Sequence, residues 1–117
     1  MEPVNSCVFC QIANHTHPAK IYTEDEEIVV FQDTKHVAPV HILIIPKKHI
    51  DSINTLSKND AELIGKMVLM GQRMAKEFKV DQSGYRLVFN TGPHAGQSVF
   101  HVHLHLIGGR HLPFRFE

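Results

Sequence analysis

Three histidines alternate with apolar residues near the C-terminal end of the chain, in the run FHVHLHLIGG. His101, His103 and His105 would project from one face of an extended strand. The apolar residues that alternate with them would pack on the core from the other face: Phe100, Val102, Leu104 and Leu106. Successive histidines on such a face lie about 6.6 Å apart, so the outer two lie roughly 13 Å apart, too far to ligate one tetrahedral metal easily. We therefore expect the three imidazoles to have different roles.

Imidazole can attack phosphorus because part of it is neutral at pH 7, and its phosphoryl adduct is labile enough to hydrolyse. Two other interpretations of the three histidines stay open from the residues alone. The rings could be solvated on an outer sheet face, or a His-x-His pair could supply two ligands of a catalytic zinc with an open coordination position.

The loop before these histidines is suited to an anion. Gly92 and Gly96 permit close approach of the backbone, and three neutral side chains, those of Asn90, Gln97 and Ser98, can donate hydrogen bonds. The loop has neither the P-loop lysine pattern nor GxGxxG. A tight turn between strands explains its glycines equally well, so the neighbouring histidines are what favour a phosphate site.

The two cysteines, Cys7 and Cys10, have a C-x-x-C spacing. The first residues lack the basic segment and apolar segment of a secretory leader, so we expect a cytoplasmic, reducing environment. That environment disfavours a structural disulfide and favours a metal site or a redox pair.

Length and charge limit the classes of partner. The chain has 117 residues and an ordinary globular composition, which predicts one domain over residues 1–117. Twelve Lys and Arg balance twelve Asp and Glu, which argues against nucleic acid or an anionic membrane as the main partner. The expected partner is a small molecule or another protein.

The elements that position these residues predict an α+β fold with an antiparallel sheet. A short helix is expected through Val8, Phe9 and Ile12, and strands over residues 20–23, 28–32, 41–45, 85–89 and 98–107. Residues 57–60 fit a capping box before a long amphipathic helix. Its apolar stripe comprises Leu63, Ile64, Met67, Val68, Met74, Ala75 and Phe78.

The run QSVFHVHLHLIGGR resembles the signature of the histidine triad (HIT) family, specifically its purine nucleotide-binding, Hint-type branch. The resemblance covers nearly the whole chain, including CVFCQI and FQDTKHVAPVHILIIPKKHI. It implies a five-stranded antiparallel sheet with one long and one short helix, joined to a second sheet across a homodimer. It also implies hydrolysis of a nucleoside phosphoramidate or nucleotidyl bond at the α-phosphate. A slow or non-catalytic nucleotide-binding regulator is the alternative.

The same resemblance implies roles for individual residues. His103 would be the nucleophile and would carry a nucleotidyl-histidine intermediate; the catalytic set is His103, His105, His101 and Ser98. His105 and His41 would surround the phosphate, and Asn90, Gln97 and Ser98 would hold phosphate oxygens or the leaving group. Asp33 would accept hydrogen bonds from the ribose hydroxyls, and Phe9 and Ile12 would wall the base pocket.

Some relatives within this resemblance bind a structural zinc through two cysteines and two histidines. The corresponding residues are Cys7, Cys10, His49 and His101, and no cofactor is expected for the chemistry itself. The alternative is two cysteines packed as small hydrophobic residues, with His49 in solvent. The chain has no Trp, whereas Hint-type members often close the site with a Trp-bearing tail, so the resemblance does not specify a leaving group. His94 is expected to be an exposed loop residue.

Overall fold

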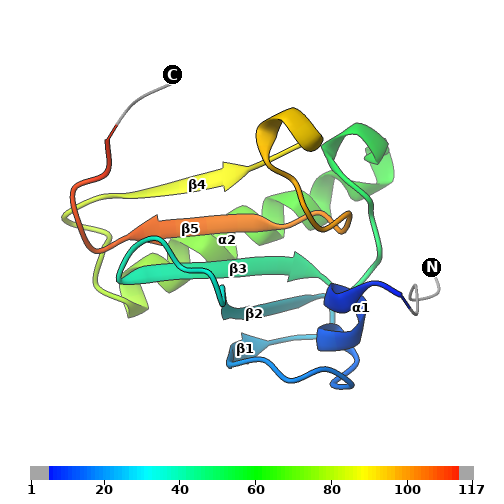
Figure 1. Cartoon of the computed structure of the whole chain (residues 1–117), viewed down its shortest axis with the longest axis horizontal. Coiled ribbons are helices and arrows are strands. Elements are labelled where there is room, and N and C mark those ends of the chain that lie inside the picture. The colour runs from blue at the N-terminus through cyan, green and yellow to red at the C-terminus, as the bar shows by residue number, and fades with distance from the viewer. Residues whose placement is uncertain (1–5, 114–117) are drawn as a thin grey trace.

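A five-stranded antiparallel sheet forms the centre of the structure, a computed structural model that describes residues 6–113 (Figure 1). The strand order is β1-β2-β3-β5-β4. The strands are β1 Ile21–Glu24, β2 Ile28–Gln32, β3 Val40–Pro46, β4 Tyr85–Phe89 and β5 Leu104–Gly108. The helices are α1 Val8–Ala13 and α2 Ala61–Glu77, with short 3-10 turns at Ile53–Thr55, Lys58–Asp60 and Pro93–Ala95. The predicted α+β class, the five strands and the pair of helices are confirmed.

Both faces of the sheet are covered by apolar residues. On β2, Ile28 and Val30 face α2, while Val29 and Phe31 face α1. Figure 1 shows α2 crossing one face of the sheet, and α1 lying near the ends of β1, β2 and β3. A strand buried on both faces has no polar alternation. This burial accounts for the continuous apolar runs of β2 and β3.

The long helix begins where the capping box predicts. The Asp60 carboxylate accepts hydrogen bonds from the Ser57 N–H (2.9 Å) and the Ser57 hydroxyl (3.2 Å), and the 3-10 turn there leads into α2. Val68 was predicted on the apolar stripe, but it is 42% exposed. Met70 and Gly71 are buried instead. An added Cβ at Gly71 would lie 2.9 Å from a methyl group of Leu87 on β4, so the Leu87 side chain would have to shift.

The last strand is shorter than the sequence pattern predicts. It begins at Leu104 rather than at residue 98, and Phe100, expected in the core, is 50% exposed. Pairing ends at Ile44 and Leu104, and the next hydrogen-bonding position of β3 on this register is Pro46. Proline has no N–H to donate to a ladder. The Val102 carbonyl therefore has no donor at that position. The Pro46 carbonyl accepts from His101 Nε2, and the Val102 N–H donates to the Ile50 carbonyl (2.6 Å).

The predicted single domain spans residues 1–117, of which residues 1–5 and 114–117 lie outside the described part of the chain. Within residues 6–113, no helix combines the length and the apolar character that crossing a bilayer would need.

Candidate active site and metal centre

The sheet face that α1 covers has apolar side chains on β2 and histidine side chains on β5. Phe31 on β2 is opposite Leu43 on β3, and Leu43 is opposite His105 on β5. Strand alternation places His41, two residues before Leu43, on the same face. The pairing register therefore brings two of the predicted site histidines together beside an apolar floor.

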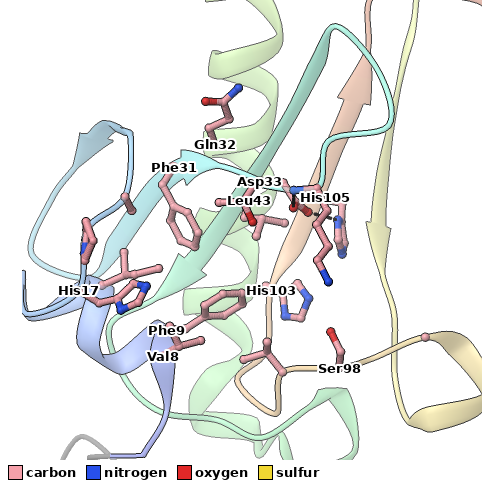
Figure 2. Close-up of a pocket in the computed structure, with 17 residues that line it drawn as sticks. Val8, Phe9, His17, Phe31, Gln32, Asp33, Leu43, Ser98, His103 and His105 are labelled. Atoms are coloured by element: carbon pink, nitrogen blue, oxygen red, sulfur yellow. Dashed lines mark hydrogen bonds and ion pairs between the residues drawn. The ribbon is translucent and has the colours of Figure 1, made fainter.

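A cavity of about 320 Å³ opens over this row (Figure 2). Apolar side chains line one part of it: Val8, Phe9, Ile12, Phe31 and Leu43. Its polar lining includes Asp33, Lys35, Ser98, His103 and His105. Figure 2 shows Phe9 and Phe31 on one side, with His103, His105 and Ser98 on the other. A cavity of this size with a few convergent polar groups is typical of a small-molecule site.

His103 has one ring nitrogen engaged and one left free. Its Nδ1–H donates to the backbone carbonyl of His101 (2.8 Å), and its ring packs edge-on against Phe9 with centroids 5.1 Å apart. Burial lowers the pKa of His103, so the neutral ring is favoured. In that ring Nε2 keeps its lone pair, and His103 lines the cavity.

His41 and His105 form a hydrogen-bonded pair whose proton positions follow from a backbone group. The Val37 N–H donates to His41 Nδ1 (3.1 Å), and His41 Nε2 lies 2.9 Å from His105 Nδ1. Because a backbone donor cannot give up its proton, neutral His41 must carry its own proton on Nε2 and donate it to His105. The proton of His105 is then on Nε2, 3.5 Å from Asn90 Nδ2. Two donors cannot bond, so this tautomer requires the Asn90 amide to turn its oxygen toward the ring.

Both rings of this pair are neutral at pH 7. Burial, with smaller contributions from His103 and His41, lowers the pKa of His105 to about 4. Burial also lowers the pKa of His41, although the nearby Asp33 carboxylate acts in the opposite direction.

Asp33 lies at the wall of the cavity and is partly engaged. Its Oδ1 accepts the Lys35 N–H (2.8 Å), and its Oδ2 lies 3.3 Å from His41 Nε2 and 3.9 Å from His105 Nδ1. The three side chains are close enough to suggest a metal site. However, His41 Nε2 carries a proton and has no lone pair for a cation, so hydrogen bonding explains this group better.

A second cluster comprises Cys7, Cys10, His49 and His101, whose ligand atoms all lie within 4.8 Å of one another. Cys7 is the N-cap of α1, so C-x-x-C spans the first turn of that helix. Cys10 Sγ lies 3.2 Å from His49 Nδ1 and 3.5 Å from His101 Nδ1. Zinc bonds of about 2.3 Å to sulfur and 2.0 Å to nitrogen place tetrahedral ligands about 3.3–3.8 Å apart. The cluster fits that geometry.

The outer ring nitrogens of this cluster are held by oxygen acceptors. His49 Nε2–H donates to Asp51 Oδ1 and His101 Nε2–H donates to the Pro46 carbonyl, each at 2.7 Å. Both Nδ1 lone pairs are thereby left facing the sulfur atoms, as zinc ligation requires. His49 is 9% exposed, so the alternative of a solvated His49 is wrong.

The structure also corrects the picture of three histidines on one strand face. The His101 side chain is fully buried in the Cys/His cluster and contributes only its backbone carbonyl to His103. Solvated rings and a shared catalytic zinc on His101 and His103 are therefore both excluded, because their Nδ1 atoms face sulfur and a carbonyl respectively. Burial lowers the pKa of His101 to about 4.

The polar loop residues have separate roles. Ser98 is exposed and lines the cavity, and His94 is exposed as predicted. Gln97 is buried and does not line the cavity. Its Oε1 accepts the Gly92 N–H (2.8 Å), and its Nε2 donates to the carbonyls of Asp51 (2.8 Å) and Val99 (3.2 Å). Gln97 thus shapes the loop.

Sequence reasoning missed the groups that act through others. The Val37 N–H and the Pro46 carbonyl are backbone groups, which leave no residue-type signal. Asp51 did leave a signal, because a carboxylate two residues after a candidate metal-binding histidine can accept its outer N–H. Phe31 and Leu43 line the cavity but read as ordinary core residues.

Comparisons with known proteins agree with this arrangement. A family model described as "Scavenger mRNA decapping enzyme C-term binding" matches residues 6–114. A purine nucleoside phosphoramidase of Escherichia coli K12 is 37% identical over 90% of this chain and 88% of its own length. The crystal structure of a HIT family hydrolase from Legionella pneumophila Philadelphia 1 is 43% identical, with a TM-score of 0.92 over 93% of this chain and 97% of that one.

A further similar structure bears on the Cys/His cluster. It is a Zn-bound histidine triad family protein from Mycobacterium smegmatis, 34% identical, with a TM-score of 0.79 over 90% of this chain and 76% of that one.

Proposed function

The chain belongs to the histidine triad family, and we propose that it hydrolyses purine nucleoside phosphoramidates, or related nucleotidyl bonds, at the α-phosphate. The observation that carries the proposal is the free Nε2 of His103 beside the cavity, left unprotonated because Nδ1 donates to the His101 carbonyl. The relatedness to a purine nucleoside phosphoramidase supports the choice of substrate class.

In the proposed first step, the His103 Nε2 lone pair attacks the α-phosphorus and the bond from phosphorus to the leaving nitrogen breaks. The leaving amine takes a proton, for which the Ser98 hydroxyl at the cavity wall is our proposed donor. In the second step, water attacks the phosphorus of the nucleotidyl-histidine and gives one proton back to the Ser98 oxygen. The bond from phosphorus to His103 Nε2 breaks, which releases a nucleoside monophosphate and free His103. The His101 carbonyl stabilises the charge on the ring while the adduct exists, because it accepts the Nδ1 proton.

The phosphate oxygens are held by neutral donors in this proposal. His105 carries its proton on Nε2, because His41 donates to its Nδ1. Asn90 lies beside that nitrogen, and Ser98 lines the same cavity. Preorganised donors aimed at developing charge lower the barrier of phosphoryl transfer. Gln97 acts in this scheme through the loop that it orders.

The nucleoside would occupy the remainder of the cavity. Phe9 and Ile12 from α1, with Phe31 and Leu43 from the sheet, provide apolar surfaces for a purine. Asp33 lies between them and the histidines, where its carboxylate can accept from ribose hydroxyls.

We propose that Cys7, Cys10, His49 and His101 hold a structural zinc. Bound there, the ion would connect the first turn of α1 to the segments that carry His49 and His101. It would steady the carbonyl that orients His103 and the α1 wall of the cavity. It has no part in the chemical steps.

We also propose that two copies of the chain pair through the free edge of β4, with cytoplasmic localisation as the sequence predicts. In the described sheet β4 pairs only with β5, so its outer edge is open. Leu69 on α2, the helix that packs on this strand, is 62% exposed. An open edge with apolar surface near it is suited to a second copy.

The direct test is capture of the adduct. Protein mixed with adenosine 5′-phosphoramidate and denatured at alkaline pH should gain one adenylyl group by mass spectrometry, and peptide mapping should locate it on His103. His103→Ala should form no adduct and lose at least about 1,000-fold in kcat, with nucleotide affinity within about tenfold.

His94→Ala is the matched control, because this histidine is exposed on the preceding loop. It should keep the parent rate. Substantial turnover by His103→Ala would contradict the nucleophile assignment. A parent protein that binds nucleotide without turnover would favour the regulatory alternative.

A further inference from the structure

The chain passes close to the loop between β2 and β3 immediately after the last strand. Gly109 follows the end of β5 with a φ of 92°, and an added Cβ there would lie 3.1 Å from the Pro39 side chain. This conformation and this contact both favour glycine. The residue that follows, Arg110, is thereby placed against the loop.

The Arg110 guanidinium donates two hydrogen bonds to one carbonyl of that loop. Its Nε (3.3 Å) and Nη2 (3.1 Å) both donate to the Val37 carbonyl, while Nη1 donates to the His111 carbonyl (2.9 Å). The loop has few other attachments, and the Val37 side chain is 58% exposed. Among the described residues, the only other hydrogen bond from residues 36–39 to the rest of the protein is the one from the Val37 N–H to His41.

We propose that Arg110 is a positioning residue that holds the Val37 backbone, and through it fixes which nitrogen of His41 and of His105 carries the proton. The Val37 N–H faces His41 Nδ1, so the His41 proton is on Nε2 and the His105 proton is on its own Nε2. The Val37 backbone and one side chain, that of His41, therefore connect the exposed Arg110 guanidinium to the cavity-lining imidazole of His105.

Loss of the hydrogen bonds from Arg110 to the Val37 carbonyl would allow His41 and His105 to carry their protons on the opposite ring nitrogens. If the Val37 N–H moves away, His41 can carry its proton on Nδ1 and accept at Nε2 from His105 Nδ1–H. His105 Nε2 would then present a lone pair, which repels a phosphate oxygen, where it now presents a donor. This consequence for catalysis rests on the proposed function, whereas the effect on the proton positions does not.

The experiment combines two measurements on the metal-loaded protein. Long-range 1H–15N spectra of 15N-histidine-labelled protein at pH 8 distinguish protonated from unprotonated ring nitrogens, with His41→Gln used to assign the His41 signals. Steady-state kinetics with adenosine 5′-phosphoramidate give kcat and KM separately. The variants are Arg110→Ala and Arg110→Lys, and Arg73→Ala on the exposed face of α2 is the control.

We expect His41 in the parent to be protonated on Nε2 alone, and Arg110→Ala to populate the Nδ1-protonated form. We expect kcat to fall about tenfold, equivalent to the loss of one well-oriented donor, with KM within about twofold. Arg110→Lys, which can still donate to the Val37 carbonyl, should recover part of both effects. Arg73→Ala should match the parent.

Unchanged His41 proton positions in Arg110→Ala would overturn the proposal, even if kcat or the melting temperature fell. Should Arg110→Ala fail to fold, the His41 proton positions in Arg110→Lys decide instead. Lysine cannot reproduce both hydrogen bonds of the guanidinium, so part of the Nδ1-protonated form should still appear. A parent protein without turnover would refute the proposed function, but the spectra would still test the role of Arg110.

Discussion

In the cluster of Cys7, Cys10, His49 and His101, each imidazole donates its Nε2 proton to an oxygen, so both Nδ1 lone pairs face the sulfur atoms. Around the cavity the arrangement differs. His41 Nδ1 accepts from a backbone N–H, and His103 Nδ1 donates to a carbonyl. In our proposal the same side chain is therefore a metal ligand in one region, and a positioning group or a nucleophile in the other. The partner of the second ring nitrogen decides which.

His101 belongs to both regions. Its ring faces the two cysteines, and its backbone carbonyl accepts the Nδ1 proton of His103. The Cys/His cluster and the cavity histidines are therefore adjacent but use different ring nitrogens. A variant can disrupt one group of residues while the other is measured.

The largest expected effect comes from removing the sulfur ligands. The double variant Cys7→Ser with Cys10→Ser should contain less than about a tenth of an equivalent of zinc by elemental analysis. Closed zinc sites contribute on the order of 10 kcal/mol of apparent binding energy, so the melting temperature should fall by about 10 °C or more. The nucleophile should still form its adduct, because His103 lies outside the metal cluster.

His94→Ala should leave both metal content and melting temperature unchanged, since this exposed histidine belongs to neither cluster. A double-serine variant that retained a full equivalent of zinc would refute the four-ligand site.

A smaller effect is expected from acid, and it tests the cavity cluster. The pKa of His105 is about 4 in the folded protein, against about 6.5 in an unfolded chain. Between these values the unfolded chain binds a proton that the folded protein does not. The resulting stability is complete above pH 6.5 and is lost as the pH falls toward 4, by about 2 kcal/mol at pH 4.5.

Urea unfolding at pH 7.5 and pH 4.5 measures this loss. His105→Gln should lose less stability over the same interval, because the variant lacks the group whose protonation is disfavoured. Equal losses in the parent and the variant would mean that His105 is not the group responsible.

The smallest expected effect is on zinc affinity, and it tests the acceptor of the His49 Nε2 proton. Asp51→Ala removes the acceptor of the His49 Nε2 proton and should weaken zinc affinity about tenfold in competition with a chromogenic chelator. Asp51→Asn keeps an acceptor oxygen and should lose less. Asp81→Ala, at an exposed position after α2, is the control. An unchanged affinity in Asp51→Ala would show that this acceptor does not support the site.

The sequence pattern predicted much of the fold because burial has a simple period. The antiparallel hairpin of β2 and β3, the capping box before α2 and the Cys/His set were all legible from residue types and spacing. Val68 and Phe100 were wrongly assigned to the core, because hydrophobicity alone does not say which apolar residues of a stripe meet a partner.

The division of labour among the histidines was less legible. Alternation continued through His101 in sequence while the sheet stopped at Leu104. Gln97 was predicted at the phosphate from its amide, yet that amide bonds to the loop backbone. What orients each ring is often a backbone N–H or carbonyl brought from another segment. Such groups are present at nearly every residue, so residue types cannot single them out.

The position of Pro46 at the end of β3 limits how this sheet could be redesigned. An ordinary residue there could add one more rung to the ladder with the segment before Leu104, and the sheet would look more regular. The added rung would draw that segment into the pleat and turn the His101 ring away from the Pro46 carbonyl that now receives its proton. A change that makes the sheet more regular would thus disrupt the proposed metal site, because the carbonyl that accepts from His101 belongs to the irregular strand end.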